Sequence, residues 1–250
     1  MLTSTTPGLC SRPLLSFVLA AALSFALAPS VAAVSVGHVD SFEDGTTQGW
    51  TINLRGFGAP PAAAYPTNVA SGGPSGADDN YLLLTALGGS GGGSRLTAIN
   101  VGAAWTGDFS AAGISGIRLQ ARNFGTTELQ LRLMLENPVG GPPTDVAISD
   151  DPLLLPSGGG WTTLEFSLEV ADLITLLGDV NALLGNVTVL RLFHSSDDAF
   201  PGESITAQLG VDNITALGNG TPPTGVPEPG TLALLGLGLA GLAAARRRAR

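Results

Sequence analysis

The sequence predicts an all-β domain, a two-sheet antiparallel jelly-roll sandwich with one short helix, and three observations support this. Apolar and polar residues alternate over short stretches, and clusters of Gly, Pro, Asn and Asp separate those stretches. A single segment between residues 34 and 217 has helical spacing instead. At least eight stretches have this alternating pattern. Their spacing, with long variable loops between them, favours two packed sheets over a closed up-and-down barrel.

The clearest expected strand covers residues 127–136. One face carries Leu129, Leu131, Leu133 and Leu135, and the other carries Glu128, Gln130, Arg132, Met134 and Glu136. This pattern predicts a half-buried strand. Residues 117–121 repeat the pattern, and Asn123-Phe124-Gly125 would connect the two strands as a hairpin. The other expected strands are residues 50–54, 81–87, 95–101, 164–168, 187–193 and 205–215.

The segment with helical spacing covers residues 173–184. Its apolar residues are Leu173, Leu176, Leu177, Val180, Leu183 and Leu184, interrupted by Gly178 and followed by Gly185. We expect a short, broken helix packed across the sandwich, because glycine commonly ends helices. The glycine-rich residues 88–94 are expected to form a flexible loop.

The N-terminus predicts export through the Sec pathway. Residues 1–13 are polar with Arg12, residues 14–27 form an apolar signal helix, and small residues end the segment at Ala33. We therefore expect residues 1–33 to be a signal peptide. Cys10, the only cysteine, precedes the apolar run, so the mature chain contains no disulfide.

The C-terminus has a motif, an apolar segment and a basic end. The motif is Val226-Pro227-Glu228-Pro229-Gly230, the apolar segment is residues 231–245, and the end contains Arg246, Arg247, Arg248 and Arg250. The apolar helix has about fifteen residues, fewer than the roughly twenty that cross a bilayer comfortably. The arginines are expected to stay cytoplasmic as a membrane stop. An ordinary tail anchor is the alternative interpretation.

This tail, residues 227–250, resembles the PEP-CTERM sorting signal of Gram-negative bacteria. The resemblance implies recognition by an exosortase, a membrane protease, and transient anchoring in the inner membrane through the C-terminal helix. It further implies delivery to the cell surface or extracellular matrix, with exopolysaccharide as a partner. Residues 218–226 would be a flexible linker, and residues 34–217 the folded domain.

The charge of the exported segment excludes some partners. Twenty acidic residues less Glu228 leave 19, and eleven basic residues less Arg12 and the four terminal arginines leave six. Residues 34–225 therefore carry a net charge of about −13. Such a surface is unsuited to nucleic acid and anionic lipid, and it is compatible with neutral glycans, ice or divalent cations.

Two motifs lie at the ends of the domain. Asp40-Ser-Phe-Glu43-Asp44-Gly45, followed by Gly49-Trp50, opens it, and Leu209-Gly-Val-Asp212-Asn-Ile214 closes it. Together they resemble the first and last strands of galactose-binding-like jelly rolls and related carbohydrate-binding modules. The resemblance implies a structural calcium ion held by the side chains of Glu43 and Asp212, with Asp40 or Asp44 as additional ligands. The alternative is that these acids lie in solvated turns.

The sequence predicts no catalytic residue. The pairs Asp78-Asp79, Asp150-Asp151 and Asp197-Asp198 lie in loop sequences, where solvated turns are the commoner explanation. We expect a non-catalytic binding or structural module. Phe57 and Tyr65 are the preferred glycan-stacking rings, because their Gly/Pro-rich surroundings cannot easily bury them. Ice or surface adhesion is the first alternative, and a glycoside or polysaccharide hydrolase is the second.

Overall fold

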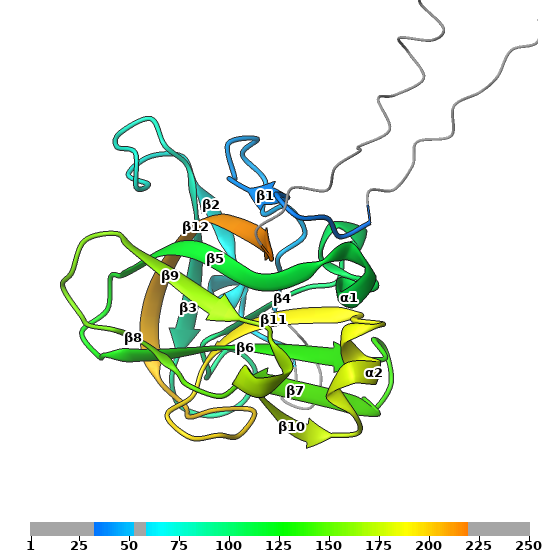
Figure 1. Ribbon diagram of the computed structural model, residues 1–250. Helices are drawn as coiled ribbons and strands as arrows, with labels where there is room; N and C mark the ends of the chain where they lie inside the picture. Colours follow the sequence, from blue (N-terminus) through cyan, green and yellow to red (C-terminus); the bar gives the residue numbers. More distant parts are fainter. Residues whose placement is uncertain (1–32, 53–58, 220–250) are drawn as a thin grey trace, which may run out of the picture. The chain divides into compact units, whose positions relative to one another are not determined.

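The computed structural model describes residues 33–52 and 59–219 (Figure 1). The expected signal helix, most of the linker and the whole sorting tail therefore lie outside the described residues, as does Phe57. No helix within the described residues is long and apolar enough to cross a membrane.

Twelve strands of the described residues form two six-stranded antiparallel sheets (Figure 1). Sheet A has the order β2 (Thr67–Val69), β3 (Tyr81–Leu87), β12 (Thr206–Gly218), β5 (Ile114–Asn123), β9 (Thr162–Ser167), with β1 (Val39–Asp40) beside β12. Sheet B has the order β10 (Leu173–Leu177), β7 (Asp145–Ser149), β6 (Leu129–Asn137), β11 (Val189–His194), β4 (Thr97–Asn100), with β8 (Leu153–Leu155) beside β6. The expected all-β jelly-roll sandwich is confirmed.

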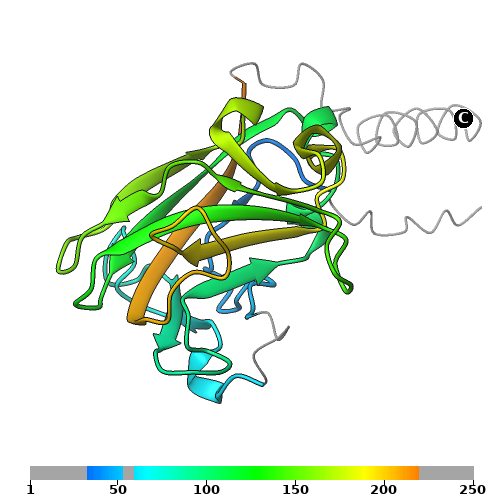
Figure 2. The same ribbon diagram turned by 90° about the horizontal axis from the view of Figure 1, so that it is seen from below.

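The core lies between the two sheets. Figure 2 shows the long strand β12 in orange, and its alternate residues Ala207, Leu209 and Val211 are buried toward sheet B. The expected leucine face of β6 is buried as well, with Leu129 and Leu131 completely inaccessible to solvent. Burial of these alternating apolar side chains is the main force that holds the sheets together.

The expected hairpin at Asn123–Gly125 is wrong. β5 pairs with β12 and β9 in sheet A, whereas β6 pairs with β11, β7 and β8 in sheet B, so this connection crosses from one sheet to the other. The side chain of Asn123 fixes the crossing. It accepts a hydrogen bond from the Gly125 amide (2.9 Å) and donates to the carbonyls of Thr127 (2.8 Å) and Leu155 (3.1 Å).

The expected helix over residues 173–184 is only half correct. Leu173–Leu177 is β10, which pairs with β7, and only Val180–Leu184 forms a helix, α2. Gly178 separates them with φ +72, a left-handed conformation that a residue with a side chain rarely adopts. Asp179 then starts the helix by accepting a hydrogen bond from the Ala182 amide (2.8 Å). Pairing with β7 at the edge of sheet B thus decides the structure of residues 173–177, in spite of their helical spacing.

Two further differences concern short segments, and a third concerns the burial of β6. The expected strand 50–54 is represented by one bridge between Thr51 and Ile99, and Leu54 lies outside the described residues. A second helical turn, α1 (Phe109–Ala112), precedes β5. The second face of β6 is not solvated, because Arg132, Met134 and Glu136 are all buried. The outer face of sheet B is therefore covered, in part by the loop between β11 and β12.

A cluster of three rings covers the outer face of sheet A. Tyr81, Phe124 and Trp161 have ring centroids 5.3–6.2 Å apart. They lie directly over Gly210 in β12, where a Cβ would be 2.7 Å from Phe124, 2.8 Å from Trp161 and 3.2 Å from Tyr81. Glycine is therefore required for the rings to approach the strand this closely. We call these residues the ring cluster.

Candidate functional site

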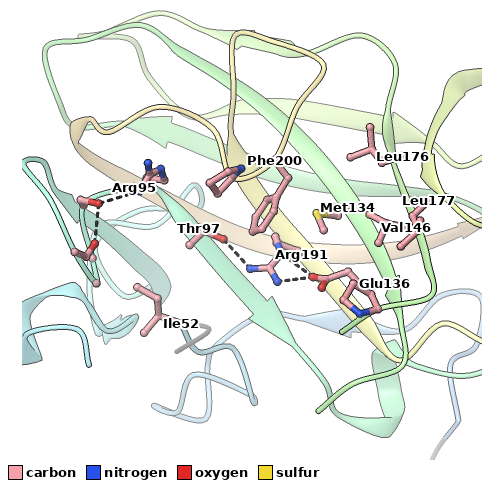
Figure 3. Close-up of a pocket in the computed structure, with 16 residues that line it drawn as sticks. Ile52, Arg95, Thr97, Met134, Glu136, Val146, Leu176, Leu177, Arg191 and Phe200 are labelled. Carbon is pink, nitrogen blue, oxygen red and sulfur yellow. Dashed lines mark hydrogen bonds and ion pairs between the residues drawn. The ribbon is translucent and has the colours of Figure 1, made fainter. Parts of the chain in front are cut away.

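A pocket with a volume of about 410 Å³ lies on the outer face of sheet B (Figure 3). Strands β4, β11, β6 and β7 supply its floor, and the C-terminal end of β10 supplies one wall. The loop between β11 and β12 contributes Phe200 and Pro201, and the glycine-rich segment contributes residues 91–95. Ile52 and Pro143 complete the lining among the described residues. A volume of this size is typical of small-ligand sites, which span about 300–1,000 Å³.

A buried ion pair forms the floor of this pocket. Arg191 of β11 donates from Nε to Glu136 Oε1 (2.8 Å) and from Nη2 to the same oxygen, and Nη1 donates to the Thr97 hydroxyl (3.3 Å). The side chains of Glu136 and Arg191 are 6% and 1% exposed. All of the bonds to the carboxylate use Oε1, so the second carboxylate oxygen of Glu136 accepts nothing from the described residues and is left for a ligand.

The walls are apolar. Leu177, Leu176 and Phe200 are 49%, 38% and 36% exposed, although each is a large hydrophobic residue. The Phe200 ring packs against the Arg191 guanidinium, whose carbon lies 4.6 Å from the ring centroid. It also packs edge-on against Phe193, at 5.7 Å between centroids. An apolar wall over a charged floor suits a ligand that has both an apolar face and hydroxyl groups.

Arg132 holds the β11–β12 loop, residues 195–205, against the sheet. Its guanidinium donates to the carbonyls of Ser195 (3.3 Å), Ser149 (2.7 Å) and Asp150, and to the Asp198 carboxylate (2.7 Å). Its side chain is 2% exposed. A buried arginine needs this many acceptors to offset the loss of water, and in return it fixes the loop that carries Phe200.

His194 makes the second attachment of the same loop. Its Nδ1 accepts from the Gln130 amide (3.0 Å), and its Nε2 lies 3.5 Å from Glu203 in the loop. Burial lowers the pKa of His194, because it disfavours the charged imidazolium, and the nearby Glu203 carboxylate opposes this effect. The Glu203 carboxylate in turn accepts from the Ser196 amide (3.0 Å).

The sequence did not identify this pocket. Of the two preferred rings, Phe57 lies outside the described residues, and Tyr65 is half-buried after a short 3-10 helix and does not line the pocket. The usable signal was the charge pattern of β6 and β11. Arg132, Glu136 and Arg191 are charged residues within apolar strands, and such residues are seldom buried without a partner.

The four predicted calcium ligands are not brought together as one group. Asp40 is buried, and its Oδ2 accepts from the indole nitrogens of Trp50 (2.7 Å) and Trp105 (2.6 Å). Its Oδ1 lies 3.1 Å from His38 Nε2. Asp40 therefore joins β1 to the tryptophan core. Asp44 is exposed and accepts from the Thr46 amide (2.8 Å) and hydroxyl (2.9 Å), which lowers its pKa.

Asp212 and Glu43 are placed differently. Asp212 is fully buried, and its pKa is raised to about 7. Burial is the main cause, the nearby Asp79 and Glu43 carboxylates add to it, and the hydrogen bond from the Asn213 amide opposes it. Glu43 is exposed and accepts from the Asn80 amide (3.0 Å). Within residues 33–52 and 59–219, no three His, Cys, Asp or Glu side chains are arranged to hold a metal ion. The donor chemistry of Asp212 and Glu43 nevertheless suits calcium.

The paired acids lie on three separate loops. Asp78-Asp79 precede β3, Asp150-Asp151 follow β7, and Asp197-Asp198 follow β11. Only the second pair borders a described pocket, together with Glu165 and Asp172, and its volume is about 170 Å³. This volume is below the range of most small-ligand sites.

Comparisons with known proteins agree with this architecture. Residues 225–248 match the model of the PEP-CTERM protein-sorting motif. No curated protein matches the sequence. An exo-β-agarase structure aligns with TM-score 0.50 and 15% identity over 76% of this chain and 26% of its own.

Two carbohydrate-binding modules are also similar. The family 11 module from Clostridium thermocellum, in complex with a β-1,3-1,4-mixed-linked tetrasaccharide, has TM-score 0.46 and 15% identity, covering 75% of this chain and 98% of its own. The xylan-binding CBM22-1 domain from Paenibacillus barcinonensis has TM-score 0.43 and 15% identity, covering 75% and 99%. At this identity the comparisons concern the fold alone. The chain thus carries a PEP-CTERM sorting motif, which implies export and exosortase processing, behind a jelly-roll sandwich.

Proposed function

We propose that residues 34–217 form a non-catalytic glycan-binding module of a cell-envelope or extracellular-matrix protein, and that the pocket on sheet B is its ligand site. The observation that carries this proposal is that the pocket combines apolar walls with a charged floor. Exposed apolar side chains flank a buried carboxylate, one oxygen of which accepts no hydrogen bond from residues 33–52 and 59–219. A pyranose ring has apolar C–H faces and hydroxyl edges, so it can satisfy both parts of such a site.

Binding is favoured over hydrolysis by the number of carboxylates. A glycosidase needs two carboxyl groups facing across its cleft, about 5–9.5 Å apart. Among the described residues that line the pocket, Glu136 is the one acid, and it is held by Arg191. Ice or surface adhesion receives no specific support, because the outer face of sheet A carries rings and an Arg118–Glu165 ion pair. A flat, regular threonine array would favour that alternative.

A matched pair of leucine variants tests the site. Leu177→Ala removes an exposed apolar wall, whereas Leu154→Ala removes a leucine of β8, 57% exposed, that does not line the pocket. With soluble polysaccharides in affinity electrophoresis and calorimetry, we expect Leu177→Ala to weaken binding about tenfold, because the bound sugar then covers less apolar surface. Leu154→Ala should bind like the unmodified domain. Equal losses in both variants would place the ligand elsewhere.

The delivery proposal is that the chain is exported by the Sec pathway, held briefly in the inner membrane, and released when an exosortase removes the tail. Its support is the match at residues 225–248. In a host with the exosortase, mass spectrometry of the surface fraction should find chains without residues 231–250. A triple alanine substitution of Pro227, Glu228 and Pro229 should retain the full tail in the membrane fraction. Cleavage of that variant would contradict the role of the motif.

A structural calcium ion is a further part of the proposal. Asp212 and Glu43 would be its side-chain ligands, and the Glu43 carboxylate is one of the charges that act on Asp212. A cation would supply the compensating charge that the buried Asp212 carboxylate lacks. Asp40 and Asp44 would not take part, because the tryptophans and Thr46 engage their oxygens.

Thermal unfolding tests this ion directly. Calcium at a hundred times its dissociation constant should stabilise the fold by about 2.7 kcal/mol, because it binds only the folded chain. EGTA should reverse the effect. Asp212→Asn should abolish the response, and Asp44→Asn should retain it. If neither calcium nor EGTA changes the melting temperature of the unmodified domain, the domain has no such site.

A further inference from the structure

The pocket on sheet B has a polar side and an apolar side, and the order of the strands separates them. β4 and β11 contribute Thr97 and Arg191, whereas β7 and β10 contribute Val146, Leu176 and Leu177. β6 lies between these two pairs of strands. Figure 3 shows the same division, with Thr97 and Arg191 on one side and the two leucines on the other. We call Val146, Leu176 and Leu177 the apolar half of the pocket.

The strand register places the buried carboxylate at the border of this apolar half. Glu136 of β6 is the Cα partner of Val146, and Val146 is in turn the partner of Leu177. The three residues therefore form one row across neighbouring strands. Because strands lie about 4.8 Å apart, the backbones of Glu136 and Leu177 are about 10 Å apart. A pyranose ring with a hydroxyl at Glu136 is narrower than this row, so a group attached to the ring has to fill the apolar half.

The side chains of the apolar half determine the chemistry of that group. None of the three has an N–H or O–H group, and Leu177 and Leu176 remain 49% and 38% exposed. A sugar hydroxyl pressed against them would lose its water without gaining a side-chain partner, which is unfavourable. A methyl group in the same place would remove apolar surface from water, which is favourable. The apolar half therefore suits a substituent that ends in a methyl group and donates no hydrogen bond.

We propose that this pocket binds an O-acetylated glycan, whose acetyl methyl group lies against Val146 and Leu177 while a free hydroxyl of the same sugar donates to Glu136. The inference rests on the proposed glycan-binding function and assigns its substrate class. An acetyl ester removes the hydroxyl donor and carries a methyl group farther from the ring than a methyl ether does. The exposure of Leu176 and Leu177 leaves water within reach of the ester carbonyl.

The experiment compares ligands that differ only in their acetyl esters. Soluble xylo-oligosaccharides with acetyl esters are titrated by calorimetry into the purified protein, and the same preparation is titrated after mild alkali has removed the esters. Acetylated glucomannan oligosaccharides, treated in the same way, provide a second backbone. We expect the acetylated form of at least one backbone to bind about tenfold more tightly, because its methyl group covers the apolar half and no hydroxyl is desolvated there.

A matched pair of variants locates the preference. Leu177→Asn places a hydrogen-bonding amide in the apolar half, at a position exposed enough to tolerate it. Leu154→Asn makes the same change in β8, where the side chain is 57% exposed and does not line the pocket. We expect Leu177→Asn to lose or reverse the preference for the acetylated form, and Leu154→Asn to keep it.

The possible failures separate the ligand from the function. An unmodified protein that binds both forms equally, or binds the alkali-treated form better on both backbones, overturns the acetyl assignment and leaves the glycan-binding function standing. A protein that binds neither form of either backbone, nor any other neutral polysaccharide, overturns the function itself. A preference that survives in Leu177→Asn, or is lost equally in both variants, overturns the assignment of the acetyl group to this pocket.

Discussion

The outer faces of the two sheets are covered in opposite ways. On sheet A, the ring cluster packs over Gly210 and lines neither of the two described pockets. On sheet B, the cover is incomplete, and a pocket of about 410 Å³ remains above the Glu136–Arg191 pair. We call the face under the ring cluster the closed face, although Phe124 is 37% exposed, and the face with the pocket the open face. Aliphatic side chains and Phe200 bound the pocket.

Most of the described rings lie away from the pocket proposed as the ligand site, and Phe200 is the exception. Trp50 and Trp105 bind the buried Asp40, and Trp161 donates its Nε1 to the Gly72 carbonyl (3.0 Å) while packing in the ring cluster. These rings stabilise the fold. The buried Glu136–Arg191 pair lies under the pocket instead, although burying an ion pair carries a large cost of desolvation.

The largest expected effect comes from removing one partner of that pair. Arg191→Met leaves the Glu136 carboxylate buried and uncompensated, which should lower the free energy of unfolding by about 3–5 kcal/mol in urea denaturation. Adding Glu136→Leu should recover much of the loss, because no buried charge then remains. A loss below about 1 kcal/mol in the single variant would mean that water reaches the pair, and the contrast with sheet A would weaken.

The next effect tests the closed face. Gly210→Ala places a Cβ within 2.7–3.2 Å of all three rings, so the ring cluster must move. We expect an overpacking cost of about 1–3 kcal/mol in urea denaturation, with a changed near-UV signal from Trp161. Glycan affinity should not change, because the pocket lies on the other sheet. Gly160→Ala, with no atom within 4 Å of the new Cβ, is the matched control and should unfold like the parent.

The strand pattern was largely predictable because period-two alternation reports the buried face directly. Residues 81–87 form a strand with the expected limits, and the leucine face of β6 is buried as expected. Alternation does not reveal pairing partners, so a chain crossing between sheets at Asn123–Gly125 had the same local signature as a hairpin. Likewise, the helical spacing of residues 173–177 could not show that an edge of sheet B was available.

The site was less predictable than the fold. Phe200 and Leu177 lie more than twenty residues apart, and only the folded loop and the end of β10 bring them to one pocket. Asp40 and Asp212 looked alike in the sequence, yet one accepts bonds from two indoles and the other has a pKa raised to about 7. Their difference depends on neighbours distant in sequence, such as Trp105 and Asp79.

The smallest expected effect concerns pH at the attachment of the β11–β12 loop. Burial lowers the pKa of His194 below its ordinary value of 6.5, so the unfolded chain takes up a proton first as the pH falls. The contribution of the neutral imidazole to stability is therefore fully present above pH 6.5 and decreases below it. In His194→Asn, which keeps an acceptor for the Gln130 amide, this loss between about pH 7 and 5 should be absent.

Subtracting the two stability profiles removes the contributions of Asp212 and the other carboxyls, which are common to both proteins. Glu203→Gln should steepen the loss, because the Glu203 carboxylate favours the protonated imidazole. Hydrogen exchange then locates the effect. Acidification should speed exchange in residues 195–205 before it does so in β3 or β12, because the loop that His194 and Arg132 attach covers sheet B. Simultaneous acceleration on both faces would mean that His194 reports global unfolding, and the open face would then be no more labile than the closed one.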